Sequence, residues 1–170
     1  MEPFHNLVSR LSQAGVRFVL IGVGGVNYYA QAAAATFATL DRDLFLPLDP
    51  ANELLAWRAC ESAGLELWCG DEPLDTPRDG LLAEQIVSRQ AIVRATDGKG
   101  LEVDLTLVMA GFEFEAIWRL RKVFLAGDVE IPVARLLDIV ASKAAAGRPK
   151  DRLFLATHEE TLRLLMGRQP

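Results

Sequence analysis

The sequence predicts a single α/β (α+β) domain in which helices flank a mixed β-sheet and further helices follow at the C-terminal end. Runs of β-branched and aromatic residues alternate with stretches of helical character over the first 133 residues. The remainder of the chain has helical character. No internal repeat or linker divides the 170 residues. We therefore expect one domain over 1–170, with a sheet-containing core at 1–133 and a helical part at 134–170.

The elements of the first half follow from apolar periodicity and from helix start signals. The N-terminal stretch is amphipathic at helical spacing, with Phe4, Leu7 and Leu11 on one stripe. Asp49 and Pro50 are typical of an N-cap and a first helical position. The expected elements are a helix within 1–15, a strand at 16–21, a turn at 22–25, a helix at 26–35, a strand at 44–48, a helix from 50 to near 64 and a strand at 65–69.

The second half is expected to hold two hairpins and three helices. Asp97–Gly98 is a dipeptide favoured in hairpin turns, and a further hairpin turns at Gly127–Asp128. Thr157 followed by Glu160 is a capping-box pattern. The expected elements are a surface loop at 70–80, strands at 86–95 and 101–108, a hairpin at 122–133, a helix at 135–146, a break at 147–149 and two short helices.

Composition excludes several classes of function. A net charge of −5 argues against a protein that binds nucleic acid through overall electrostatics, although the segment after residue 134 is net basic. No apolar run approaches the roughly 18 residues that a membrane span needs. Cys60 and Cys69 form no disulfide framework and are expected to be reduced thiols. These features predict a cytoplasmic protein with no membrane contact.

Three aspartates are the candidate catalytic and metal-binding residues. Asp41 and Asp43 stand two apart beside a predicted strand, which would send both side chains to one face, roughly 6.5–7 Å apart at Cα. Carboxylates so placed can hold one hard cation or bridge two. Asp104 lies within an otherwise apolar strand, where an acid needs a metal, a partner or solvent. A chance Asp-x-Asp pair and a solvated edge-strand Asp104 are the alternatives.

A glycine turn supplies the second candidate feature. Gly24 and Gly25 lie between the first strand and the following helix. Glycines at such a turn let backbone N–H groups approach a phosphate closely, at the positive end of the helix dipole. The order of strand, Gly-Gly turn, helix and aspartate pair therefore favours a phosphate ligand beside a metal site.

This arrangement resembles the nucleotidyltransferase superfamily, over roughly residues 15–165. The order Gly24-Gly25, then Thr39-x-Asp41-x-Asp43, then a single Asp104 looks closest to the small bacterial branch of minimal nucleotidyltransferases and abortive-infection toxin subunits. The segment from Leu137 to Asp151, which includes Lys143, Gly147, Arg148 and Lys150, is similar to a helix-Lys…Gly-Arg-x-Lys-Asp segment of that branch.

The resemblance implies a nucleotidyltransferase-like sheet and a set of site residues. Asp41, Asp43 and Asp104 would be the catalytic carboxylates and the ligands of Mg²⁺ or Mn²⁺. The nucleotide would be bound by Gly24, Gly25, Thr39, Ser142 and Lys143. The implied reaction moves an NMP from an NTP to an acceptor, with tRNA or protein favoured, and the implied setting is a toxin–antitoxin pair with a cognate partner.

One departure from the pattern keeps an alternative open. The branch commonly has an arginine two residues before the threonine, and this chain has Phe37 there. A catalytically silent nucleotide- or partner-binding protein of the same fold is therefore the second hypothesis. A two-metal nuclease would share the carboxylates but would leave Gly24-Gly25 and Lys143 unexplained. Arg148, Lys150 and Asp151 could also form a purely structural ion-pair cluster.

Overall fold

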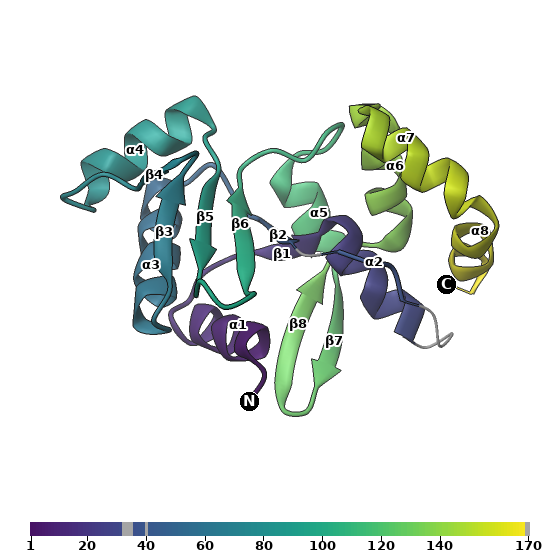
Figure 1. Cartoon of the computed structure of the whole chain (residues 1–170), viewed down its shortest axis with the longest axis horizontal. Helices are drawn as coiled ribbons and strands as arrows, with labels where there is room; N and C mark the ends of the chain where they lie inside the picture. The colour runs from purple at the N-terminus through teal and green to yellow at the C-terminus, as the bar shows by residue number, and fades with distance from the viewer. Residues whose placement is uncertain (32–35, 40, 169–170) are drawn as a thin grey trace.

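The computed structural model describes residues 1–31, 36–39 and 41–168 and confirms the α/β class. The described residues form eight helices and one mixed open sheet of eight strands (Figure 1). The sheet has the strand order β4-β3-β5-β6-β2-β1-β8-β7. The strands are β1 (Val19–Ile21), β2 (Asp41–Phe45), β3 (Glu66–Cys69), β4 (Glu72–Pro73), β5 (Val93–Thr96), β6 (Glu102–Thr106), β7 (Lys122–Ala126) and β8 (Val129–Val133).

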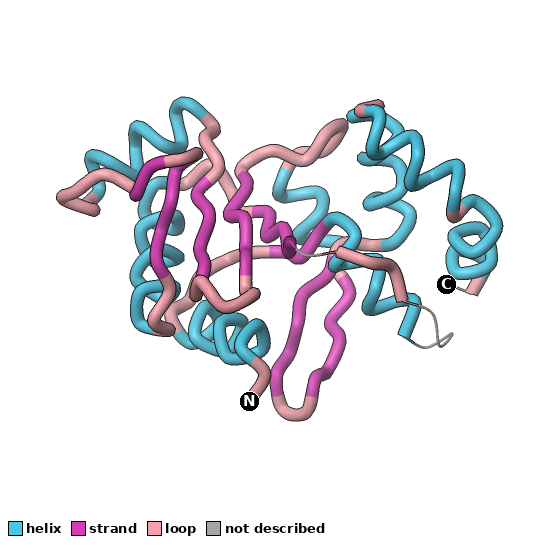
Figure 2. Tube along the Cα trace, viewed as in Figure 1, coloured by secondary structure: helices cyan, strands magenta, loops and turns pink. Residues whose placement is uncertain are grey.

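One group of helices lies beside β3, and another lies on the central strands β1 and β2, next to the C-terminal helices (Figure 2). The α3 helix packs against α1, α4 and β3, whereas α2 packs against β1, β2 and α6, and α7 packs on α6. The helices are α1 (Pro3–Gln13), α2 (Gly22–Gln31), α3 (Pro50–Ser62), α4 (Gly80–Arg89), α5 (Phe114–Leu120), α6 (Leu136–Ala146), α7 (Pro149–Thr157) and α8 (Glu159–Gly167).

Two parallel pairs make the sheet mixed. The β2 strand runs parallel to β6, and β1 runs parallel to β8, while the remaining neighbours are antiparallel. The β6, β2 and β1 strands lie in the middle of the sheet, where their apolar side chains are buried in the core. The candidate aspartates lie on β2 and β6 and are therefore placed over the middle of the sheet.

Several local predictions are confirmed. The N-terminal helix buries its predicted stripe, and Asp49 caps α3 by accepting a hydrogen bond from the backbone N–H of Ala51 at 3.0 Å. The hairpin of β7 and β8 turns at Gly127–Asp128. The α6 helix ends at Gly147, whose φ of +60° suits only glycine well, and Pro149 begins α7.

Three predictions at helix starts are wrong, and the strand predicted at 44–48 is observed as β2 at Asp41–Phe45. The stretch from Gly22 to Gly25 is the first turn of α2 and not a loop, and the rest of the expected helix at 32–35 lies outside the described residues. Residues 86–89 belong to α4, because Asp79 within the predicted loop caps a helix by accepting from Leu82 N–H at 3.0 Å. The Thr157 capping box does not form, since His158 is the N-cap of α8.

Within the described residues, no helix is long and apolar enough to cross a membrane. Both cysteines are free thiols in this structure, with Cys60 buried and Cys69 half-buried. The expectation of reduced cysteines agrees with this arrangement. Burial raises the pKa of the Cys60 thiol to about 12, so this residue behaves as a small apolar core side chain.

Glu53 is a fully buried acid in α3, and it makes stability depend on pH. Its Oε1 accepts from Trp57 Nε1 at 3.1 Å, whereas Oε2 has no partner among the described residues. Burial raises its pKa from 4.5 to about 7. The folded state therefore binds more protons than the unfolded state between these pH values, and stability falls as pH rises through them.

We expect Glu53→Gln to remove this dependence. The wild type should lose roughly 3 kcal/mol of unfolding free energy between pH 4.5 and pH 7 through this residue. The variant stays neutral and should be the more stable protein at pH 8. Urea unfolding at pH 5, 6, 7 and 8 measures the effect, with Glu84→Gln, exposed on α4, as the control. If the unfolding free energies of wild type and Glu53→Gln changed with pH in the same way, the raised pKa assigned to Glu53 would be contradicted.

Candidate functional site

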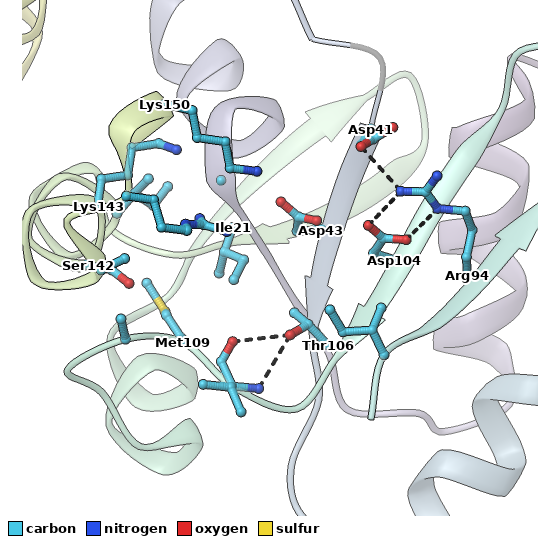
Figure 3. Close-up of a pocket in the computed structure, with 17 residues that line it drawn as sticks. Ile21, Asp41, Asp43, Arg94, Asp104, Thr106, Met109, Ser142, Lys143 and Lys150 are labelled. Carbon is cyan, nitrogen blue, oxygen red and sulfur yellow. Dashed lines mark hydrogen bonds and ion pairs between the residues drawn. The ribbon is translucent and has the colours of Figure 1, made fainter. Parts of the chain in front are cut away.

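A pocket of about 530 Å³ lies over the central strands β2 and β6, and this volume is within the size range of small-molecule sites. It is lined by residues from the sheet, from the loop after β6 and from the C-terminal helices (Figure 3). The lining includes Asp41, Asp43 and Asp104, so the structure brings the three predicted carboxylates together.

Strand register explains why these side chains meet. Asp43 on β2 is the direct neighbour of Asp104 on β6, and Asp104 is the direct neighbour of Arg94 on β5. On the other side, Asp43 is paired with Ile21 of β1. Residues directly opposite on adjacent strands share a face of the sheet. A single row across four strands therefore reads Arg94, Asp104, Asp43 and Ile21, with Asp41 two residues before Asp43.

Arg94 is the cation at one end of this row. Its Nε donates to Asp104 Oδ1 at 2.8 Å and its Nη2 donates to Asp104 Oδ2 at 3.1 Å, which is a bidentate pair. Nη2 also donates to Asp41 Oδ2 at 3.3 Å, and Nη1 donates to Glu102 Oε2 at 3.4 Å. The hydrogen bonds to Asp104 raise the pKa of Arg94 above its usual range. The guanidinium is thus a permanent charge in the site.

Asp43 lies between this ion-pair group and the cations across the pocket (Figure 3). Burial, and then the negative charges of Asp104 and Asp41, raise the pKa of Asp43, while Lys143 and Lys150 lower it. A cation bound in the pocket would stabilise the charged form of Asp43 and lower its pKa.

Gly22 makes room for Asp43. It adopts φ +70°, and a Cβ built on it would lie 2.6 Å from Asp43 Oδ2. A side chain there would displace the carboxylate, and the backbone conformation would be strained for any L-residue. Gly22 also begins α2 and lines the pocket, so the N-terminal end of this helix faces the cavity.

The opposite wall of the pocket is basic. Lys143 comes from α6, Arg148 from the turn after it, and Lys150 from the first turn of α7. Buried Asp151 holds two of these cations, because it accepts from Arg148 Nε at 2.7 Å and lies 3.7 Å from Lys143 Nζ. Burial lowers the pKa of Lys143 and Asp151 opposes that shift. The predicted pairing of Arg148 with Asp151 is therefore present, but the second cation of the cluster is Lys143, and Lys150 makes no ion pair with the described residues.

Gly25 places this basic wall over the sheet. A Cβ on Gly25 would lie 2.9 Å from Ile139 Cδ1, so α2 and α6 pack closely only because this residue has no side chain. Lys143 lies one helical turn after Ile139 and thus on the same face of α6. The short distance between α2 and α6 therefore brings Lys143 to the carboxylates.

The predicted nucleotide-binding residues divide into two groups. Ser142 and Lys143 line the pocket, as expected for residues that contact a ligand. Gly24 and Gly25 are buried inside α2 and do not line it. Thr39 is exposed outside the lining, and its hydroxyl donates to the backbone carbonyl of Asp41 at 3.0 Å.

Phe37 has a structural role that explains the apolar residue at this position. Its ring is buried against Phe154 and His158, with ring centroids 5.4 and 4.7 Å apart. Its backbone N–H and carbonyl both bond the side-chain amide of Asn27, at 2.7 and 2.9 Å. Phe37 thereby ties the segment before β2 to α2 and α7.

Sequence reasoning missed Gly22, Arg94 and the apolar part of the lining. Ile92, Val108 and Met109 form that apolar part together with residues of β1 and α6. A polar Arg94 between Val93 and Ala95 was the available signal, since alternation places it on the face opposite two buried residues. Arg94 can be assigned to the site only when the register of the β5–β6 hairpin, which places it opposite Asp104, is known.

The donor set can be tested against a divalent cation. Three carboxylates on neighbouring strands, two of them in direct register, are hard oxygen ligands of the kind that Mg²⁺ and Mn²⁺ prefer. In the described part of the chain, however, no group of three or more His, Cys, Asp or Glu side chains is arranged to hold a metal ion. Arg94 already holds Asp41 and Asp104. The residues fit a cation chemically, and Arg94 is the group that a metal has to displace.

Comparison of the chain with models of known protein families and with curated proteins found no match.

Proposed function

We propose that this protein is a nucleotidyltransferase that moves an NMP from an NTP to an acceptor, with Mg²⁺ or Mn²⁺ on Asp41, Asp43 and Asp104. The observation that carries the proposal is one pocket with three carboxylates on its sheet side and three cations on its helical side. A triphosphate is the ligand class with the charge to neutralise the cations, and the carboxylates suit the metal that accompanies it.

The basic wall and the start of α2 are suited to the phosphates. Lys143 and Lys150 present ammonium groups to the pocket, as point charges that can contact phosphate oxygens. The first turn of α2 has backbone N–H groups that no residue of the helix accepts, and it begins at the pocket with Gly22. These groups would hold the β- and γ-phosphates away from the carboxylate row.

The carboxylate row is suited to the reacting end of the nucleotide. The acceptor hydroxyl oxygen forms a bond to the α-phosphorus, the bond from that phosphorus to the bridging oxygen breaks, and pyrophosphate leaves. Asp104 would take the proton of the hydroxyl, once Arg94 no longer occupies both of its oxygens. When bound, the metal ion would neutralise charge on the phosphoryl group and orient the hydroxyl. Asp43 lies between the two walls and would hold that ion.

The acceptor and the biological setting rest on the resemblance to the small bacterial nucleotidyltransferase branch. We propose a macromolecular acceptor, tRNA or protein, and a cognate toxin or antitoxin partner. The open pocket and the half-exposed Ile92 and Val108 at its margin leave access for a large acceptor. The net charge of −5 makes a local contact near the basic helices the expected mode of binding an RNA acceptor.

A second candidate is the catalytically silent nucleotide- or partner-binding protein of the same fold. The specific observation in its favour is the pairing of Arg94 with Asp41 and Asp104. If that pairing persists when nucleotide is bound, two of the three carboxylates stay unavailable. The two candidates differ in pyrophosphate release, which only the transferase produces.

Thermal unfolding with each of the four NTPs in Mg²⁺ tests the proposal. We expect one NTP to stabilise the protein, by about 2.7 kcal/mol at a hundredfold excess over Kd. Lys150→Gln should weaken that stabilisation, because it removes a pocket cation and leaves the bonds of Asp151 in place. Lys122→Gln, at an exposed position of β7, is the matched control and should behave like the wild type. Absence of both stabilisation and pyrophosphate release with all four NTPs would refute nucleotide binding.

A further inference from the structure

Arg94 is bonded as a metal ion would be, which distinguishes it from an ordinary surface arginine. It joins carboxylates from two strands, Asp104 on β6 and Asp41 on β2, through one guanidinium. Its Nη1 group contacts a third acid, Glu102. The described residues around the guanidinium are thus acids on three sides, and the positive charge offsets their mutual repulsion.

The pairing is built into the sheet and does not depend on a flexible side chain finding a partner. Arg94 and Asp104 are direct neighbours in the antiparallel pair of β5 and β6, so the backbone hydrogen bonds of the hairpin set their separation. The Asp104 side chain is 14 % exposed, which limits competition from water. A bidentate pair of this kind is among the stronger hydrogen-bonded ion pairs in proteins.

Arg94 nevertheless has room to leave. Its side chain is 39 % exposed, and the guanidinium borders the pocket. A phosphate that enters the pocket would offer a second bidentate partner within reach of the same side chain. A second arrangement, in which Arg94 bonds that phosphate, would free Asp41 and Asp104 to bind another cation.

From this arrangement we propose that Arg94 is the resident cation of the carboxylate cluster in the nucleotide-free protein and that it excludes divalent metal from Asp41 and Asp104. This inference rests on the proposed function for its biological meaning, since it makes metal enter together with nucleotide. The effect of Arg94 on metal affinity does not depend on that function. It states that one intramolecular ion pair sets the metal affinity of the free site.

Titration of the nucleotide-free protein with Mn²⁺, followed by the EPR signal of the free ion, tests the proposal. We expect weak binding by wild type and binding at least roughly tenfold tighter by Arg94→Gln, equivalent to about 1.4 kcal/mol. Arg94→Lys keeps the charge but lacks the planar pair of N–H groups that matches the two oxygens of Asp104, and its Mn²⁺ affinity should fall between the two. Arg94→Gln with Asp104→Asn should lose the gain, which would locate the ion at this cluster.

Arg89→Gln is the matched control, because it removes the same charge from an exposed position on α4. It should bind Mn²⁺ as the wild type does. An affinity of Arg94→Gln within about twofold of wild type, with the fold checked by circular dichroism, would overturn the proposal. Tight Mn²⁺ binding by the wild type would do so as well. Failure of the NTP experiments would refute the transferase while leaving this result intact, so the two proposals are tested separately.

Discussion

Asp43→Asn is expected to lower NMP transfer by roughly a thousandfold or more, because under the proposed function Asp43 holds the metal ion that would neutralise charge on the reacting phosphate. Asp43 is the carboxylate between the two walls of the pocket, and Arg94 does not neutralise it (Figure 3). Asparagine has the same shape and keeps one oxygen, so the change isolates the charge. Pyrophosphate release and incorporation of labelled NMP into an acceptor are the measurements.

The same substitution should leave stability unchanged or higher at neutral pH. Burial and neighbouring acids raise the pKa of Asp43, which means that its charged form is disfavoured in the folded state. A lower rate with an equal or higher unfolding temperature would separate a catalytic role from a structural one. Glu130→Gln is the control, since Glu130 is exposed on β8 and lies outside the pocket lining. Normal turnover by Asp43→Asn would refute its assigned role.

Gly22→Ala is expected to abolish transfer and to destabilise the fold. The added Cβ would lie 2.6 Å from Asp43 Oδ2, so the carboxylate has to move out of its place in the row. The backbone at φ +70° adds strain of roughly 1–2 kcal/mol for a residue with a side chain. Turnover should fall to the level of Asp43→Asn, and urea unfolding should report the loss of stability.

Gly24→Ala provides the contrast for this second prediction. Its Cβ would meet Arg42 Cγ at 3.4 Å, an ordinary contact, and its position inside α2 favours alanine by roughly 0.5–1 kcal/mol. This variant should be at least as stable as wild type and fully active. If Gly22→Ala and Gly24→Ala had equal turnover and equal stability, the close contact between Gly22 and Asp43 would not be needed for activity.

The sequence was sufficient for the class of fold and for part of the site. Apolar periodicity identified α1, and an aspartate followed by proline identified the start of α3, because both signals are local. The aspartates were found from their spacing and from an acid within an apolar strand. The sequence predicts a turn at Gly24-Gly25, whereas this pair lies in the first helical turn of α2, because glycine marks both a tight turn and a close helix contact. Only the position of Ile139 against Gly25 distinguishes the two.

Arg94 could not be found because its partner depends on the length of one hairpin loop. A two-residue turn at Asp97–Gly98 would pair Arg94 with Leu101. In the structure Thr96 pairs with Glu102, so the loop is longer and Arg94 lies opposite Asp104. Asp97 stabilises the longer loop by accepting from the N–H groups of Lys99 and Leu101. The register of β5 against β6 therefore determines whether Arg94 lies beside the carboxylates of the row.

The position of β2 in the sheet has a consequence during synthesis on the ribosome. The β1 and β2 strands can pair early, but the other edge of β2 stays open until β6 has been made. The apolar run from Leu44 to Leu46 is buried in the finished protein and is exposed in the nascent chain. Asp41, Arg42 and Asp43 place charges immediately before this run, and charges on an unpaired edge oppose aggregation. The acids of the site are therefore also expected to oppose self-association of the incomplete chain.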